Sequence, residues 1–256
     1  MAGRWAAHPL RALTRRQQRR LDSPDGPGVP FHRLDFVIVD VETTGLSPGE
    51  ASITEIGAVR VRRGRVRDRF TSLVNPGGAI PEQVAAVTGI SDAMVASAPS
   101  LALVLRRFLD FAGRDCVLTA HNAAFDVGFL TAACDACHFA WPAFPVLDTL
   151  DLAHQLLAPD EVPNCKLATL ADFFGARTLP CHRALPDALA TADVLAALLR
   201  RLAAIGVTTL SYGEAGPGLA TLGVISEATE ALGDTLPATD AWQGGTSGHR
   251  DRADPC

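Results

Sequence analysis

The segment FVIVDVETTGL at residues 36–46 constrains the fold more than any other stretch of the chain. Four apolar residues, three of them β-branched, precede Asp40 and Glu42, which are separated by one valine. Such a run is typical of a strand buried on both faces, and because successive side chains of a strand alternate, the two carboxylates point the same way. Leaving both charged and unpaired beside a core would cost roughly several kcal/mol. The pair therefore requires a cation, a proton or an arginine.

The rest of the chain has the alternating strand and helix pattern of one α/β domain. Two runs rich in Val and Ile meet at Gly64, which predicts a hairpin beside the first strand. Short strands are expected at 116–120 and 144–150. Helices are expected at 100–112, from residue 123, at 149–157, at 166–174, and in a final long segment with Pro186 at or near its first position.

We divide the chain into three parts. Residues 1–34 are expected to form a basic extension rich in Pro and Gly, with a helix candidate at 10–21. The domain is expected at 35–205. Residues 206–256 are rich in Gly, Ala, Thr and acids without periodicity, so we expect an acidic and mostly disordered tail.

Charge and cysteine content narrow the function classes. The net charge of −5 argues against a large basic nucleic-acid footprint but leaves a short contact at a strand end open. The arginine cluster RRGRVRDR at 62–69 is the best basic candidate, and a solvated hairpin turn is its favoured interpretation. The six cysteines are expected to be thiols because no export signal is visible. The segment CDACH at 134–138 matches a haem or zinc pattern, but it lies in an expected helix without a second cysteine pair, so we predict that it binds nothing.

No apolar run has membrane-spanning length, and the N-terminal residues lack the continuous apolar segment of a secretory signal. We therefore expect a cytoplasmic protein with no membrane partner. The arginine-rich start leaves a mitochondrial transit peptide as a minor alternative.

Further candidate residues lie at the ends of other expected elements. Asp126 lies in the first turn of a helix that follows a strand, and Asp187 begins the final helix. An acid at either position also has a structural explanation, since it interacts favourably with the helix dipole. His182 lies on the loop before Asp187, where a histidine is most often simply solvated, and Asn122 occupies the expected N-cap of the helix at 123.

Together these residues resemble a known family. The chain is similar to the DEDDh family of 3′–5′ exonucleases, above all to the epsilon proofreading subunit of bacterial DNA polymerase III and its stand-alone relatives, in the segments DVETTGL, HNAAFDVGFL and HRALPDALATADV. The resemblance covers about residues 35–202 and neither terminal extension. It implies a ribonuclease H-like mixed sheet of about five strands flanked by helices.

The resemblance also implies roles for individual residues. Asp40, Glu42, Asp126 and Asp187 match the acids that hold two divalent metal ions in the family, and His182 matches the general base. The sister family with a tyrosine shortly before the last acid is excluded, because the single tyrosine, Tyr212, lies in the tail. Contacts with the terminal nucleotide are implied for Thr43, Thr44, Gly45, Leu46, Thr88, His121 and Asn122.

The chemistry of these residue types is consistent with that role. A ligand set of hard oxygens without cysteine or histidine suits Mg²⁺ or Mn²⁺. Two such ions about 4 Å apart, bridged by Asp40, would activate water and stabilise the leaving oxygen of a phosphodiester. An imidazole with an ordinary pKa near ~6.5 can accept the proton of that water.

The expected function is therefore release of 5′-mononucleotides from the 3′ end of DNA, preferably single-stranded or frayed, in proofreading or repair. Two alternatives stay open: a 3′–5′ exoribonuclease of the same family, and a catalytically silent subunit that binds a polymerase. The presence of all five motif residues argues against the silent subunit. The expected partners are 3′ ends of single-stranded DNA, with RNA as the alternative substrate and a DNA polymerase subunit as a further candidate.

Overall fold

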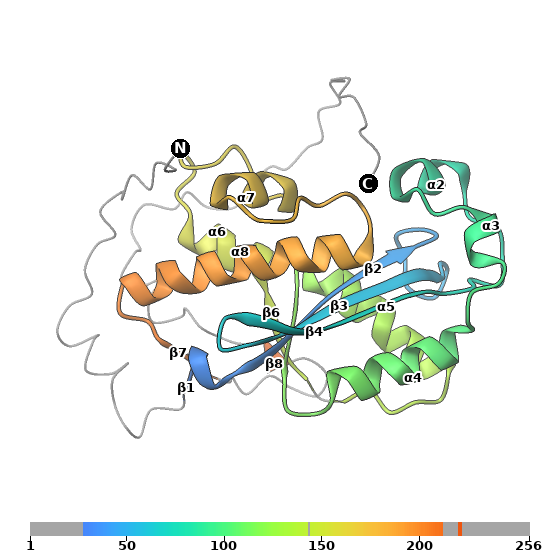
Figure 1. Ribbon diagram of the computed structural model, residues 1–256, viewed down its shortest axis with the longest axis horizontal. Coiled ribbons are helices and arrows are strands. Elements are labelled where there is room, and N and C mark those ends of the chain that lie inside the picture. The colour runs from blue at the N-terminus through green and yellow to red at the C-terminus, as the bar shows by residue number, and fades with distance from the viewer. Residues whose placement is uncertain (1–27, 143, 212–219, 222–256) are drawn as a thin grey trace.

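The computed structural model describes residues 28–142, 144–211 and 220–221 (Figure 1). Its elements in chain order are β1 (Gly28–Pro30), the 3₁₀ turn η1 (Phe31–Arg33), β2 (Asp35–Thr43), β3 (Ile53–Arg62), β4 (Arg65–Leu73), α2 (Glu82–Thr88), α3 (Asp92–Val95), α4 (Leu101–Ala112), β5 (Val117–Ala120), α5 (Ala123–Ala136), β6 (Pro145–Asp148), α6 (Thr149–Leu156), α7 (Leu167–Phe174), α8 (Ala184–Ala204), β7 (Thr209–Ser211) and β8 (Ala220–Thr221).

A mixed sheet forms the centre of the molecule. Its strand order is β4-β3-β2-β5-β6, and the two-residue strand β8 adds to the β6 edge. The first three strands are antiparallel neighbours, whereas β2, β5 and β6 run parallel. This is the expected arrangement of about five strands, and the turn of the β3–β4 hairpin contains Gly64 as expected.

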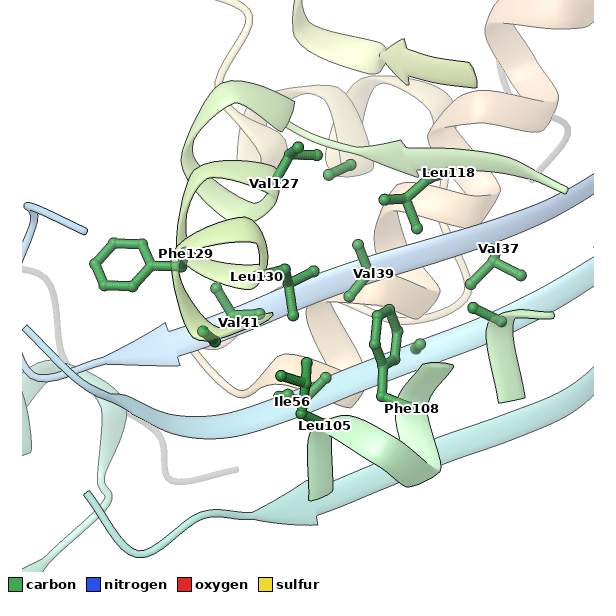
Figure 2. Close-up of a cluster of buried hydrophobic side chains, with 14 of the residues drawn as sticks. Val37, Val39, Val41, Ile56, Leu105, Phe108, Leu118, Val127, Phe129 and Leu130 are labelled. Carbon is green, nitrogen blue, oxygen red and sulfur yellow. The ribbon is translucent and has the colours of Figure 1, made fainter. Parts of the chain in front are cut away.

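The two faces of the sheet carry separate cores, as the alternation along β2 requires. Val37, Val39 and Val41 point to one face and pack against α4 and α5, among them Phe108 and Leu130 (Figure 2). Phe36 and Ile38 point to the other face, where the cluster includes Ala188 and Leu195 of the long helix α8. The residues that follow at even positions, Asp40 and Glu42, therefore face α8.

The buried residues of helix α4 explain why the spacing of apolar residues in the sequence predicted a helix there. Its buried residues are Val104, Leu105, Phe108 and Ala112, a single stripe along one side of the helix. Helix α8 begins at Ala184, so Pro186 is its third residue. Proline is tolerated there because the N–H groups of the first turn have no partner within the helix.

The packed region extends beyond the expected limits of 35 and 205. Strand β1 pairs with β7, and both Val207 and Leu210 are buried, because the end of the sheet beside α8 offers apolar surface to cover. Residues 207–211 are thus part of the fold. The helix candidate at 10–21 lies outside the described residues.

The described cysteines differ in state. Cys116, Cys134, Cys137 and Cys165 are thiols. Cys181 is disulfide-bonded, so the expectation of thiols is wrong for that residue; the absence of an export signal, on which it rested, does not determine the state of an individual cysteine. Burial raises the pKa of Cys134 to about 11, which disfavours a thiolate ligand, and the prediction that CDACH binds no cofactor stays a prediction.

None of the helices in the described ranges is both long and apolar enough to cross a bilayer.

Candidate metal centre

The centre begins with the two acids of β2. In the antiparallel pairing with β3, Asp40 lies opposite Gly57 and Glu42 lies opposite Glu55. The parallel partner β5 reaches only the level of Ile38, so β2 continues beyond its neighbour and presents both acids at the end of the sheet. Both are partly buried beneath the start of α8.

Gly57 allows α8 to approach the sheet at this point. A Cβ on Gly57 would lie 2.2 Å from the backbone carbonyl carbon of Ala184, the first residue of α8, so only glycine fits. Glu55, two residues before Gly57, fixes the same helix end. Its carboxylate accepts hydrogen bonds from Arg183 Nε at 3.0 Å, Arg183 Nη2 at 2.8 Å and the Ala184 backbone N–H at 3.0 Å. The start of α8 is therefore held against β3 by both shape and charge.

This docking brings the third carboxylate to the site. Asp187 lies in the first turn of α8, and single carboxylate oxygens of Asp40, Glu42 and Asp187 all lie within 4.8 Å of one another. The Asp187 carboxylate accepts a 2.7 Å hydrogen bond from the backbone N–H of Cys181. This hydrogen bond holds the loop at residues 181–183 against Asp187, the acid that follows it in the chain.

His182 lies at the centre of this loop. Its backbone has φ 57°, in the left-handed region that few non-glycine residues adopt, and its side chain is exposed. The loop position places the imidazole next to Asp187 and leaves it open to solvent. The residue is thus available for proton transfer, although its role as general base stays a prediction.

Asp126 reaches the same strand from the other face of the sheet. Because β5 ends before it reaches the level of Val41, the backbone N–H of Val41 lacks a strand partner on that side. The carboxylate of Asp126, in the first turn of α5, takes this position and accepts the N–H at 3.0 Å. Asp126 is thus hydrogen-bonded to Val41, the residue that separates Asp40 from Glu42 in β2.

The four acids repel one another and are poorly solvated. Burial, followed by the charges of Asp126 and Asp187, raises the pKa of Asp40 well above its usual range. Burial also raises the pKa of Glu42 to about 8, with Asp187 and Glu55 adding to the effect. The pKa values of Asp126 and Asp187 are raised as well, mainly by burial, and are partly restored by backbone hydrogen bonds. The site as a whole is short of positive charge.

Asp148 is a structural acid that sequence analysis missed. Its carboxylate accepts the backbone N–H groups of Asn122 at 3.0 Å, Ala123 at 2.7 Å and Leu150 at 2.8 Å, so it caps both α5 and α6. Asn122 has the N-cap position, but its side chain makes no capping bond and is exposed. The capping explanation for Asn122 is therefore wrong, because a carboxylate from the adjacent strand β6 already occupies that place.

Two of the expected nucleotide contacts are engaged within the fold. The His121 ring lies 2.9 Å from the Thr149 hydroxyl through Nδ1 and 2.9 Å from the Cys165 carbonyl through Nε2. The Thr88 hydroxyl donates to the Val84 carbonyl at 3.0 Å, and its side chain is buried. Contact with a nucleotide would require either residue to exchange these bonds, and it stays a prediction.

The loop after β2 holds the remaining expected contacts. Thr43 donates from its hydroxyl to the Gly45 carbonyl at 2.5 Å, and Thr44 accepts the Ser52 N–H at 2.9 Å. The tight loop leaves Leu46 with 85% of its surface exposed, four positions after Glu42. A single exposed leucine is common on protein surfaces, so contact of Leu46 with a nucleotide stays a prediction.

The residues that dock α8 also escaped sequence analysis. Glu55, Gly57 and Arg183 carry no signal by themselves, apart from the placement of a glutamate inside the apolar strand ITEIGAV. Asp148 had a readable signal, since an aspartate between a strand and a helix is a favoured N-cap. Taken together, the described residues form a cluster of carboxylates that can hold a divalent cation, with an exposed imidazole beside it.

Comparison with known proteins agrees with this chemistry. The family model described as "Exonuclease" matches residues 37–195. A bifunctional exonuclease/endonuclease protein of Mycobacterium tuberculosis is 47% identical over 209 residues, which cover 79% of this chain and 32% of that protein. The PolC-type DNA polymerase III of Caldanaerobacter subterraneus is 41% identical over 177 residues, 69% of this chain and 12% of the polymerase. The chain thus spans a third or less of the length of these relatives.

Solved structures show the same fold. Exonuclease X in complex with 5′ overhanging duplex DNA matches with a TM-score of 0.50 and 27% identity, over 64% of this chain and 91% of that one. Escherichia coli exonuclease I in complex with a dA16 oligonucleotide matches with a TM-score of 0.60 and 18% identity, over 68% of this chain and 42% of that one. The expected ribonuclease H-like sheet flanked by helices is confirmed by these likenesses.

Proposed function

The chain belongs to the exonuclease family, and from this premise we propose that it is a metal-dependent 3′–5′ exonuclease that hydrolyses the terminal phosphodiester bond of DNA and releases 5′-mononucleotides. One observation carries the proposal. Carboxylates from β2 and from the distant helix α8 converge within 4.8 Å, and Asp126 is bonded to the same short stretch of β2. A fold gains nothing in stability from such crowding, which points to a functional reason for it.

The residues present fit a divalent cation. Asp40, Glu42, Asp126 and Asp187 would hold it, and their raised pKa values show that the cluster lacks the positive charge that a cation would supply. The set consists of hard oxygen donors, which favours Mg²⁺ or Mn²⁺, and the proposed number of ions is two. When bound, the ions would lower the pKa of a water molecule and stabilise charge on the leaving oxygen.

The chain's own groups would complete the reaction. His182, exposed beside Asp187, would accept the proton of the attacking water. The backbone N–H of Cys181 donates to the Asp187 carboxylate, so the loop that carries the base is tied directly to an acid that would bind the ion. Leu46, four positions after Glu42, and Asn122, at the N-cap of the helix that carries Asp126, are both exposed, and we assign them contacts with the terminal nucleotide.

DNA is the proposed substrate because relatives and neighbours with this domain include DNA polymerases and complexes with DNA. RNA is tested as the alternative. Association with a DNA polymerase is a separate proposal, supported by the occurrence of the matching domain within PolC-type polymerases.

The test uses the full chain with Mg²⁺ or Mn²⁺ and single strands of DNA and RNA of one sequence, labelled at the 5′ end. The expected products are 5′-labelled strands that shorten stepwise, with DNA consumed faster than RNA. Release of the label as a mononucleotide would mean the opposite polarity, and faster loss of RNA would transfer the proposal to a ribonuclease. Asp40→Asn should be inactive and Asp172→Asn, which changes an exposed acid on α7, should be normal. A wild-type protein that leaves both strands intact would be a silent subunit.

A further inference from the structure

Exposed arginines gather on the edge strand β4 and at the end of the sheet farthest from the carboxylates. We call this set the arginine edge; it consists of Arg33, Arg63, Arg65, Arg67, Arg69 and Arg114. The acids exposed among them are Asp68 and Asp115. The chain carries a net charge of −5, so this concentration of positive charge is local and runs against the overall balance.

The arginine edge is not used for folding. Two neighbouring arginines are: Arg62 forms two hydrogen bonds with Asp35, and Arg60 donates to the last carbonyls of α4, those of Phe111 and Ala112. By contrast, the ion pairs found between described residues include no member of the arginine edge. Its guanidinium groups are therefore available to a ligand.

The position of β4 relates this charge to the metal centre. Arg69 of β4 pairs with Val59 of β3, which in turn pairs with Ile38 of β2. Because residues paired across antiparallel strands lie on the same face, Arg69 lies on the α8 face, at the level of the sheet two residues before Asp40. The other end of β4 pairs with Arg62, at the level where β2 begins. Strand β4 thus extends for about 17 Å from the level of Asp40 to the far end of the sheet.

At that far end the charge lines a groove of about 770 Å³. Its lining residues come from the turn and start of β2, the β3–β4 hairpin, the segment between α4 and β5, and Pro145 of β6, and they include the acids Asp35 and Asp115. Arg33, Arg63 and Arg114 contribute one guanidinium from each of the first three segments. Arginine forks of this kind match the geometry of phosphate oxygens.

We propose that the arginine edge binds the phosphates of a single DNA strand upstream of the 3′ end held at the metal centre. The inference rests on the proposed function, since the strand would enter with its 3′ end at the carboxylates and run along β4 toward the groove. Its contribution would be affinity for long strands without base recognition.

Arginine on an edge strand has another use, because charge there prevents the strand from pairing with another chain. That explanation accounts for Arg65, Arg67 and Arg69. It does not account for Arg33 and Arg114, which lie on no edge strand yet continue the same charge into the groove.

The test compares three double variants that each remove two exposed arginines. Arg65→Ala/Arg67→Ala alters the strand, Arg33→Ala/Arg114→Ala alters the groove, and Arg106→Ala/Arg107→Ala on α4 is the control with the same loss of charge. Binding of a DNA strand of about 20 nucleotides is measured in EDTA across a salt series. Cleavage of that strand and of a dinucleotide is measured with Mn²⁺.

Both arginine-edge variants should raise the Kd for the long strand about tenfold and reduce the dependence of log K on log salt by about 1.4. KM for the long strand should rise while kcat, and kcat/KM for the dinucleotide, stay within about twofold. Binding in EDTA does not need turnover, so length-dependent binding without cleavage would refute the nuclease and leave the surface standing.

Three results would overturn the proposal. The control variant could lose as much affinity as the others, which would make the effect one of net charge. DNA binding could be unchanged while Arg65→Ala/Arg67→Ala self-associates in sedimentation, which would assign the arginines to edge protection. Finally, the variants could keep DNA affinity but lose binding of a peptide with the acidic sequence 222–256, which would assign the surface to the chain's own tail.

Discussion

The guanidinium of Arg183 and the carboxylate of Glu55 form a bidentate ion pair, 128 residues apart in the sequence, that fixes the first residue of α8 against β3. Glu55 is buried, and it adds to the charge that raises the pKa of both Asp40 and Glu42. Glu55 is therefore a fifth acid beside the metal centre. It fixes the start of α8, the helix that positions Asp187 at the centre.

A double-mutant cycle tests this pair. Glu55→Ala should lower the free energy of unfolding by about 3–5 kcal/mol, because it leaves a partly buried guanidinium unpaired. The double variant with Arg183→Ala should lose less than the sum of the single losses. The exposed pair Arg177 and Asp193 is the control, with a coupling below about 1 kcal/mol expected. Equal coupling for both pairs in urea unfolding would contradict the docking role.

Gly57→Ala should displace the start of α8, because the new Cβ would meet the Ala184 backbone at 2.2 Å. We expect a loss of about 2–3 kcal/mol in the free energy of unfolding and a weaker stabilisation by Mn²⁺. Gly78→Ala is the matched control, since its Cβ would meet nothing within 4 Å. Calorimetry with and without Mn²⁺ measures both effects, and equal behaviour of the two variants would refute the close-approach argument.

Asp40→Asn should raise the melting temperature of the metal-free protein by about 3 °C or more, because it relieves the repulsion and desolvation that raise the pKa of Asp40. The same change should abolish the further rise that Mn²⁺ produces in the wild type. Asp68→Asn should alter neither value. A lower melting temperature for Asp40→Asn without metal would show that the four acids do not form a strained, cation-deficient cluster.

Stability should depend on pH through Glu42. Its pKa is about 8 in the fold against an ordinary value of 4.5, so the unfolded chain releases this proton first as pH rises. The free energy of unfolding should therefore fall between about pH 4.5 and pH 8 in the metal-free protein and level off above. Relative to Glu42→Gln, the wild type should lose stability as pH rises from the acid end to pH 8. Urea unfolding of both proteins near pH 4.5 and at pH 8 tests this prediction. A difference in the free energy of unfolding that is the same at both pH values would contradict the raised pKa of Glu42.

His182→Asn should reduce the single-turnover rate by about 10²–10⁴-fold, the usual effect of losing a general base. Asparagine is chosen because it tolerates the left-handed backbone that His182 adopts, so the loop should survive. Mn²⁺ binding should be unchanged, since the imidazole is not among the proposed ligands. His154→Ala, which removes an exposed histidine on α6, is the control. A loss of only a few-fold for His182→Asn would leave the imidazole as a solvated loop residue.

The local parts of this protein were determined by its sequence. The period of two along β2 put Asp40 and Glu42 on one face, Gly64 marked the hairpin, and the apolar stripe of α4 gave its bounds within a residue or two. These features depend on backbone geometry and on which side chains avoid water, and both can be read from neighbouring residues. The residue types of the site were visible for the same reason.

Only the tertiary structure decided how these parts meet. Asp126 reaches Val41 across 85 residues because β5 stops short and leaves one N–H without a strand partner. Asp187 joins the two acids of β2 because Gly57 lacks a Cβ and Glu55 holds Arg183. The start of α5 is capped by Asp148 and not by the expected Asn122 for a similar reason: the carboxylate that accepts the free N–H groups comes from strand β6. Such outcomes depend on packing volumes and on competition between partners far apart in the chain, which no local pattern records.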